Sequence, residues 1–200
     1  MTPPTPASAS LWSRFASIFC AFRLGSFVAR CQGRVVGYAL TMRVNRSPYE
    51  RPLAWIEAVG GLDLRNHDSQ GEWMYGIDFV VDPTYRQRGI GTQLYQVRFA
   101  LIRRLNLRGF YAGGMLRNYS HYAHCMTPVQ YAEKVIQREV EDPTVTMQMN
   151  RGFAALGVIE SYVKADNHPA MLIAWHNAAF RAARPAPVQR RVAEAQPALG

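Results

Sequence analysis

One continuous stretch, residues 77–105, constrains the fold of this 200-residue chain more than any other part of it. Its first part, 77–81, is apolar except at Asp78, which predicts a strand covered on both faces of its sheet. Pro83 ends the strand because proline has no N–H to donate to a neighbouring strand. An apolar stripe at helical spacing then predicts a helix over 90–105, and the stripe comprises Ile90, Leu94, Val97, Leu101 and Leu105.

A second strand follows this helix almost at once. Phe110, Tyr111 and Ala112 form a short apolar run that ends in Gly113 and Gly114. Because strand–helix–strand crossovers are right-handed, the two strands are expected to lie side by side and parallel.

The turn before the helix is suited to bind an anion. Gly89 and Gly91 let the backbone approach a ligand closely, and the first N–H groups of the helix have no partner within it. The helix dipole adds a partial positive charge at this point, and Arg86 and Arg88 add full ones. A glycine-capped turn without a ligand is the plainer alternative. A nucleotide-binding loop is disfavoured, because the Gly-Lys-Ser/Thr ending is absent and Leu94 stands where a dinucleotide motif has its third glycine.

The pattern Arg86-x-x-Gly89-x-Gly91, behind a strand that ends at Pro83, resembles the acetyl-CoA signature of the GNAT N-acetyltransferase superfamily. The resemblance implies an α/β (α+β) fold: a mixed, mostly antiparallel sheet with a central pair of splayed parallel strands and flanking helices. It also implies acetyl-CoA as co-substrate, with the pyrophosphate as the bound anion. The residues expected to bind it are Phe79, Val80, Val81, Arg86, Gln87, Arg88, Gly89, Ile90, Gly91 and Thr92.

The rest of the chain agrees with this fold. Two strands, 26–31 and 34–41, flank a tight turn, and helices are expected to start near Thr127 and Asp142. Segments 156–163 and 170–175 read as a closing antiparallel pair, behind a Gly-Phe pair that the family shares. The order of these motifs is similar to one branch of the family, in which an acetyltransferase domain precedes a nitrilase-like carbon–nitrogen hydrolase domain in one bacterial polypeptide.

Three segments are predicted along the chain. Residues 1–25 are expected to be a disordered or abbreviated N-terminal segment, 26–177 the acetyltransferase domain, and 178–200 a disordered basic tail. The apolar stretch 11–24 is too short to span a membrane and lacks the pattern of a secretory signal. If the family's first strand is missing, strand 26–31 has an open edge, which would suit a homodimer.

Composition limits which classes of partner and which cellular compartment are expected. A formal net charge of +9 suits nucleic acid, but the arginines are scattered and no basic stripe with interleaved aromatics is present. No nucleic-acid or membrane partner is therefore predicted, and the charge would instead attract an anionic co-substrate. Cys20, Cys31 and Cys125 are odd in number and unpatterned, which indicates reduced thiols in a cytoplasmic protein.

The resemblance implies that the pantetheine arm inserts between the splayed strands, where N–H groups near Phe79 hold the thioester oxygen. A protonated amine is not nucleophilic, so a general base is expected nearby. Asp78 is the first candidate, because a carboxylate within an apolar strand is costly unless it is used or paired. A salt-bridged structural aspartate is the alternative reading, and Tyr75 and Glu72 are further catalytic candidates.

One position departs from the family. Many relatives have a tyrosine, five residues before the phenylalanine of the Gly-Phe pair, that protonates the leaving CoA thiolate. Here that position is Gln148, which has no proton to give at neutral pH. Either water or another group does this work, or none is needed. A CoA-binding regulatory module without catalysis therefore remains the alternative to an acyltransferase enzyme.

His121, His124 and Cys125 stand close together but form an incomplete zinc site, so no metal is expected. Their segment, 115–126, is expected to cover the acceptor site because it follows the second parallel strand. Three functions remain open: acetyl transfer to an amine of a small molecule or protein, CoA binding without catalysis, and binding of nucleic acid or another anion. The sequence does not name the acceptor.

Overall fold

A computed structural model of the chain describes residues 22–182, so most of the predicted N-terminal segment and most of the basic tail lie outside the described residues. Its elements in chain order are η1 (Arg23–Gly25), β1 (Ser26–Cys31), β2 (Arg34–Val44), α2 (Trp55–Val59), β3 (Trp73–Val81), η2 (Pro83–Tyr85), α3 (Ile90–Arg104), β4 (Gly109–Met115), η3 (Tyr119–His121), α4 (Pro128–Ile136), α5 (Val145–Met149), β5 (Ala154–Val163) and β6 (His168–His176).

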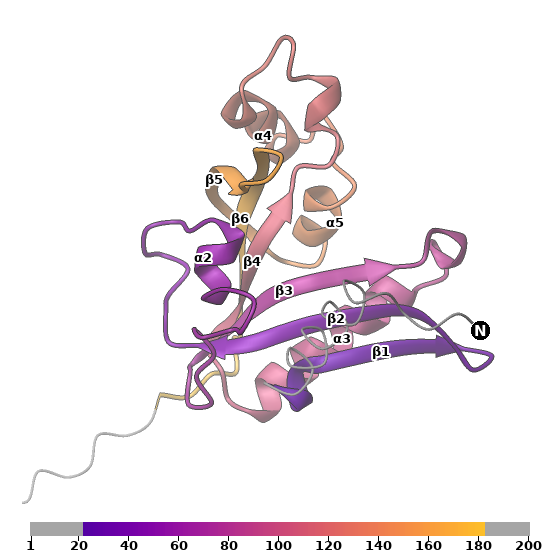
Figure 1. The fold of residues 1–200 in the computed structure, drawn as a ribbon, viewed down its shortest axis with the longest axis vertical. Helices are drawn as coiled ribbons and strands as arrows, with labels where there is room; N and C mark the ends of the chain where they lie inside the picture. Colours follow the sequence, from indigo (N-terminus) through magenta and orange to yellow (C-terminus); the bar gives the residue numbers. More distant parts are fainter. Residues whose placement is uncertain (1–21, 183–200) are drawn as a thin grey trace, which may run out of the picture.

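The six strands form one sheet in the order β1-β2-β3-β4-β6-β5. All neighbouring strands are antiparallel except β3 and β4, which are parallel and joined through α3 as the predicted crossover requires. Figure 1 shows two arms: β1, β2 and β3 run across the view, whereas β4 and β6 stand nearly upright. The fold class predicted from the sequence, including the central parallel pair, is confirmed.

The first two strands form the expected hairpin. Its two-residue turn has positive φ at both Gln32 (49°) and Gly33 (78°), which is the type I′ geometry that matches the twist of paired strands. At the other end of the sheet, β5 and β6 form the predicted antiparallel pair. The predicted helix start at Thr127 is also correct, since this residue forms a capping box with Gln130 at the start of α4.

Apolar side chains are buried on both faces of the sheet. The core between the sheet and helices α3, α4 and α5 includes Met74, Leu101, Ile102, Phe110, Tyr131 and Ile173. The core on the opposite face, beneath α2, includes Leu40, Met42, Val59, Trp73, Tyr75 and Leu172. Each aliphatic, phenylalanine or methionine side chain among them contributes roughly 1.5–3 kcal/mol when fully buried. The short helix α2 lies in the long polar connection and has too few residues for a helical period to be read from the sequence.

Helix α3 buries a different set of residues from the predicted stripe. Its central leucines are buried as expected, but Val97 is 41% exposed and Arg98 only 2% exposed. Tyr95 and Ile102 complete the buried face, which follows the usual i, i+1, i+4, i+7, i+8 pattern of a packed helix. The sequence pattern placed Val97 on the buried face instead of Arg98, because arginine is rarely buried without a partner.

Strand β3 is not covered on both faces along its whole length. Residues 73–75 are buried, but Asp78 and Val80 are exposed. The prediction of two-sided burial is therefore wrong for the second half of the strand. The reason is that the side chains packed on this face, Trp55 of α2 among them, gather over its first half. Within residues 22–182, no helix combines the length and the hydropathy needed to cross a bilayer.

Gly113 of β4 gives a direct test of the packing between β4 and β5. A Cβ at this position would overlap the ring of Tyr162, which lies across the strand. We expect Gly113→Ala to lower the free energy of unfolding by about 1–3 kcal/mol in urea denaturation. Gly157→Ala is the matched control, because its Cβ would meet no atom within 4 Å. Equal losses in the two variants would show that Tyr162 is not fixed over β4.

Candidate active site

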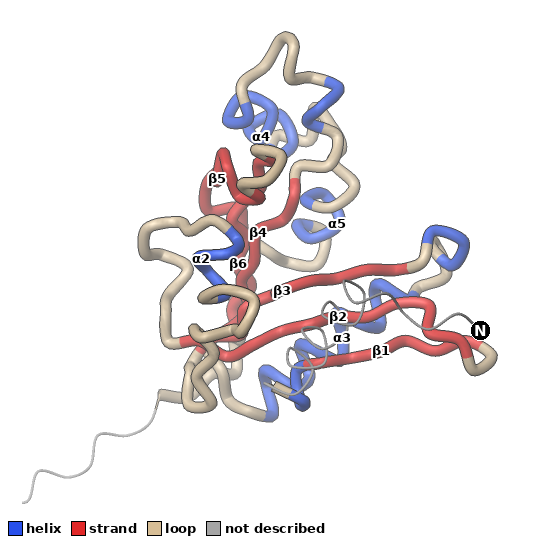
Figure 2. The backbone as a smooth tube through the Cα atoms, viewed as in Figure 1, coloured by secondary structure: helices blue, strands red, loops and turns tan. Residues whose placement is uncertain are grey.

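Strands β3 and β4 pair for only three residues. Residues 73–75 of β3 face residues 109–111 of β4, although β3 continues to Val81 and β4 to Met115. Beyond this point the strands part, as Figures 1 and 2 show. Their unpaired edges, residues 76–81 and 112–115, border a gap that is termed the splay below.

A β-bulge lies where the strands part. Leu40 and Thr41 are adjacent in β2 but face Asp78 and Gly76, so Ile77 is an extra residue of β3. The carbonyl of Ile77 accepts a hydrogen bond from the indole N–H of Trp55 in α2 at 2.9 Å. Because bulges bend and twist a strand, this one turns β3 away from β4 at the start of the splay.

The direction of the N–H groups along β3 follows from its pairing with β2. The N–H of Asp82 donates to the carbonyl of Val36, and antiparallel pairs alternate between bonded and non-bonded. The N–H of Val80 therefore points toward β2, whereas those of Phe79 and Val81 point into the splay. The N–H of Phe79 donates to the carboxylate of the preceding residue at 2.8 Å. Within the described residues, the N–H of Val81 has no acceptor and stays open toward the splay.

The turn before α3 presents six consecutive N–H groups, those of residues 87–92, without a hydrogen-bond acceptor in the described part of the chain. The first helical bond runs from the N–H of Gln93 to the carbonyl of Gly89 at 3.0 Å. Gln87 and Gly89 have positive φ values of 59° and 79°. Such left-handed residues gather successive N–H groups around one point, which is an anion-binding geometry.

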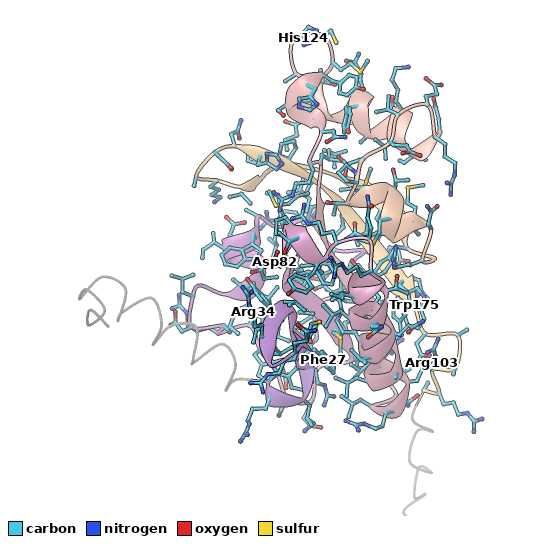
Figure 3. All side chains as sticks on the ribbon, turned by 90° about the vertical axis from the view of Figure 1, so that its right-hand side faces the viewer. Phe27, Arg34, Asp82, Arg103, His124 and Trp175 are labelled. Atoms are coloured by element: carbon cyan, nitrogen blue, oxygen red, sulfur yellow. The ribbon has the colours of Figure 1, made fainter. Side chains whose placement is uncertain are left out.

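Asp82 holds the start of this turn in place. Its carboxylate accepts from the N–H and the hydroxyl of Thr84 at 2.9 and 2.6 Å. These bonds lower the pKa of Asp82, and the nearby guanidinium groups of Arg34 and Arg86 lower it further. Figure 3 shows Arg34 of β2 beside Asp82. The β1–β2 hairpin and the turn therefore lie next to each other.

Three arginines surround the turn. Arg86 and Arg88 are exposed, and the Nε of Arg86 donates to the carbonyl of Val81 at 3.2 Å. The third is Arg151, whose Nη2 donates to the hydroxyl of Thr92 at 2.8 Å. Sequence reasoning missed Arg151, because it follows α5 and reaches the turn only through the fold. The site thus combines open N–H groups, a helix N-terminus and three cations.

Asp78 lies beside the splay on the sheet face opposite α3. Its Oδ2 accepts from the hydroxyl of Tyr38 at 2.6 Å, and its Oδ1 accepts from the N–H of Phe79. Burial and the adjacent carboxylate raise the pKa of Tyr38. Among the described residues, none of the ion pairs includes Asp78. A salt-bridged structural aspartate, the alternative reading of the sequence, is not what this part of the chain contains.

Tyr75 and Tyr162 meet where the splay begins, with their hydroxyl oxygens 2.9 Å apart. Burial raises the pKa of Tyr75 well above its usual value and that of Tyr162 to about 12. Both phenols therefore keep their protons at neutral pH, and either of them can be the donor of the hydrogen bond between them. Nothing in the sequence pattern pointed to Tyr162, whose ring reaches this place because Gly113 has no side chain.

Two other residues singled out from the sequence lie elsewhere. Glu72 is at the start of β3, away from the splay, and its Oε2 is 2.7 Å from the Nε of Arg108. Gln148 is buried on the α3 side, where its Nε2 donates to the hydroxyl of Tyr95 at 3.2 Å. Its Oε1 is buried and has no hydrogen-bond partner among the described residues.

A small cavity of about 20 Å³ adjoins the splay on the face of Asp78, with room for one water molecule. Its floor includes Tyr75, Tyr111 and Gly113, and its cover is the segment 46–53. The hydroxyl of Tyr111 donates to the carbonyl of Arg46 at 3.0 Å, which ties the cover to β4. An acceptor that approaches Asp78 from this side therefore meets the 46–53 segment.

The segment 115–126 does not line this cavity, and its expected role as a cover of the acceptor site stays a prediction. Tyr119 and Tyr122 pack against Tyr131 of α4, and Figure 3 shows His124 at the far end of the upright arm. In the part of the chain that the structure describes, no three His, Cys, Asp or Glu side chains form a cluster that could hold a metal ion.

Comparisons with known proteins agree with this geometry. A model of the acetyltransferase (GNAT) family matches residues 3–120. "Probable hydrolase YhcX" of Bacillus subtilis (strain 168) is 33% identical over 159 residues, which are 78% of this chain but 31% of that protein. The chain thus spans about a third of the length of this relative, which agrees with the predicted branch of the family.

"Uncharacterized N-acetyltransferase YkwB" of the same bacterium is 29% identical over 185 residues, covering 90% of this chain and 81% of that protein. Among solved structures, the "GphF GNAT-like decarboxylase in complex with isobutyryl-CoA" superposes with a TM-score of 0.65 at 21% identity. The superposition covers 80% of this chain and 82% of that one. At this identity the likeness concerns the fold.

Charge reversal tests whether the turn before α3 binds the pyrophosphate. We expect Arg88→Glu to weaken CoA binding at least tenfold in calorimetry, because charge-assisted hydrogen bonds to phosphate contribute about 1.5–3 kcal/mol each. Arg104→Glu is the matched control, since it makes the same charge change on an exposed residue at the other end of α3. Unchanged affinity in Arg88→Glu would mean that the anion binds elsewhere.

Proposed function

The chain belongs to the acetyltransferase (GNAT) family, and from that premise we propose that it transfers an acetyl group from acetyl-CoA to an amine of a small molecule or a protein. One observation carries the proposal: the pairing of β3 and β4 ends after three residues, directly beside a turn with six open N–H groups. A long, thin substrate with a pyrophosphate at one end and a reactive group at the other would fit this combination.

In this proposal the acetyl-CoA site has two parts, one for the pyrophosphate and one for the pantetheine arm with its thioester. The N–H groups of residues 87–92, with Arg86 and Arg88, bind the pyrophosphate, and Arg151 adds charge beside Thr92. The pantetheine arm lies along the splay, where it can take the open N–H of Val81. The thioester oxygen develops negative charge during the reaction and is stabilised by such an N–H.

Asp78 is proposed as the general base, direct or through water. The amine nitrogen attacks the thioester carbon to form the new C–N bond, its proton passes to Asp78, and the C–S bond breaks to release CoA as a thiolate. Tyr38 holds one carboxylate oxygen of Asp78 from the β2 side, and the N–H of Phe79, which points into the splay, holds the other. The raised pKa values of Tyr75 and Tyr162 support a donor role for these phenols beside the incoming amine.

The acceptor site is proposed on the face of Asp78, beneath the segment 46–53. The cavity there holds about one water, so binding of an amine requires this segment to shift. A cytoplasmic location and a homodimer paired through the outer edge of β1 remain proposals that rest on the cysteine usage and on the position of β1 at the end of the sheet.

Replacing Asp78 tests the chemistry. We expect Asp78→Asn to lower kcat about 10²–10⁴-fold, the usual contribution of a general base, and to leave the Kd for acetyl-CoA within about threefold. Thiol release and calorimetry measure the two quantities. Glu72→Gln is the control, because it removes a carboxylate of the same strand that lies away from the splay and should leave kcat unchanged. Equal kcat in Asp78→Asn and the wild type would rule out Asp78 as the base.

A panel of amines tests the activity itself. Thiol release from acetyl-CoA in the presence of at least one amine supports the transferase. Thermal stabilisation by CoA without thiol release across a broad panel would overturn it in favour of a CoA-binding module. No stabilisation by any acyl-CoA would overturn both.

A further inference from the structure

The largest fully buried side chain among the described residues is a charged one, Arg98. Its Nε donates to the carbonyl of Leu94 at 2.9 Å, but its Nη2 has no hydrogen-bond partner among residues 22–182. Within residues 22–182 no carboxylate forms an ion pair with it. Burial lowers the pKa of Arg98 to about 10, so the group stays charged at neutral pH. A buried cation without a counter-charge is costly, and such groups gather at binding sites.

The guanidinium lies at the root of the splay. Its carbon is 4.9, 4.1 and 4.9 Å from the ring centres of Phe79, Tyr95 and Phe110. Phe79 belongs to β3 beyond the point where the strands part, and Phe110 to the part of β4 that is still paired. The rings offset some of the cost through cation–π attraction, but they offer no acceptor for Nη2.

Gln148 supplies a second unpartnered atom in the same place. Its Oε1 is buried, has no hydrogen-bond partner in the part of the chain that the structure describes, and lies against Gly114 at the edge of the splay. Its Nε2 donates to the hydroxyl of Tyr95, whose ring also lies against the Arg98 guanidinium. Turning this amide by 180° would let Oε1 accept from Tyr95 and direct Nε2 toward the splay, since the two ends of an amide are interchangeable in shape. Arg98 and Gln148 together then offer two donors to one anion.

The pyrophosphate cannot be this anion. Arg98 follows Gly91 by seven residues, which is about 10 Å along a helix, and the pyrophosphate turn has its own arginines. An acetyl group carries no charge. The remaining part of an acyl-CoA that can reach the root of the splay is the far end of a longer acyl chain.

We propose that Arg98 and Gln148 form a subsite for a carboxylate at the end of the acyl chain, so that the favoured donor is a dicarboxylic acyl-CoA of three or four carbons. Arginine binds carboxylates with two parallel hydrogen bonds, which suits this use. The inference rests on the proposed acyl transfer and leaves its step unchanged. The amine forms the C–N bond, its proton passes to Asp78, CoA leaves as a thiolate, and the carboxylate stays on the acyl group.

Matched acyl-CoA pairs test the subsite on the wild-type chain. Malonyl-CoA is compared with propionyl-CoA, and succinyl-CoA with butyryl-CoA, because the members of each pair have the same number of acyl carbons and differ in charge. Calorimetry without an amine gives the dissociation constants. We expect at least one carboxylated member to bind at least tenfold more tightly than its neutral partner. Equal affinities in both pairs would overturn the subsite, while binding of acetyl-CoA with thiol release would leave the proposed transferase standing.

Variants assign the effect to Arg98. We expect Arg98→Met, which keeps a long side chain but removes the charge, to abolish the difference within each pair and to leave acetyl-CoA binding within about threefold. Arg104→Gln, an exposed residue of the same helix, should preserve the difference. Discrimination that persists in a folded Arg98→Met variant would overturn the role of Arg98. If that variant fails to fold, the wild-type pairs decide the question alone.

Discussion

The early end of pairing between β3 and β4 is the constraint on which the rest of this structure depends. Three paired residues fix the parallel register, and each strand then follows its own arm of the sheet. Unpaired strand edges are costly unless something occupies their polar groups. A side chain occupies one of them on β3, where the carboxylate of Asp78 accepts from the N–H of Phe79, and the ring of Tyr162 lies over Gly113 of β4. Residues nearest to the proposed chemistry therefore also cover the open edges.

The cofactor half of the site could be predicted from the sequence because its parts are contiguous. Strand β3, the turn that Asp82 holds, and the first turn of α3 lie within one stretch, and backbone N–H groups do most of the binding. Proline, glycine and arginine at fixed spacing specify such a turn locally. The same local logic identified the β1–β2 hairpin and the cap at Thr127, since each depends on residues next to each other in the chain.

What could not be predicted depends on contacts between distant segments. Tyr162 reaches the splay from β5, and Arg151 reaches the pyrophosphate turn from beyond α5. Arg98 was missed for another reason. A hydrophobicity pattern places the most apolar residue inside, and Val97 is more apolar than its neighbour. The structure instead buries Arg98 among three aromatic rings. An apolar pattern cannot predict this burial, because it depends on cation–π contacts from other segments and, in our proposal, on a bound carboxylate.

At the splay, the two faces of the sheet carry different residues and would select different substrates. On the α3 face, the backbone turn and the buried pair Arg98 and Gln148 would choose the acyl-CoA. On the other face, Asp78, Tyr75 and the segment 46–53 would choose the amine. The 46–53 segment contributes no strand to the sheet, and among the described residues its one hydrogen bond to β4 comes from the hydroxyl of Tyr111. Its sequence can therefore change the acceptor without disturbing the turn, the splay or the acyl subsite, which explains why the donor is easier to infer than the acceptor.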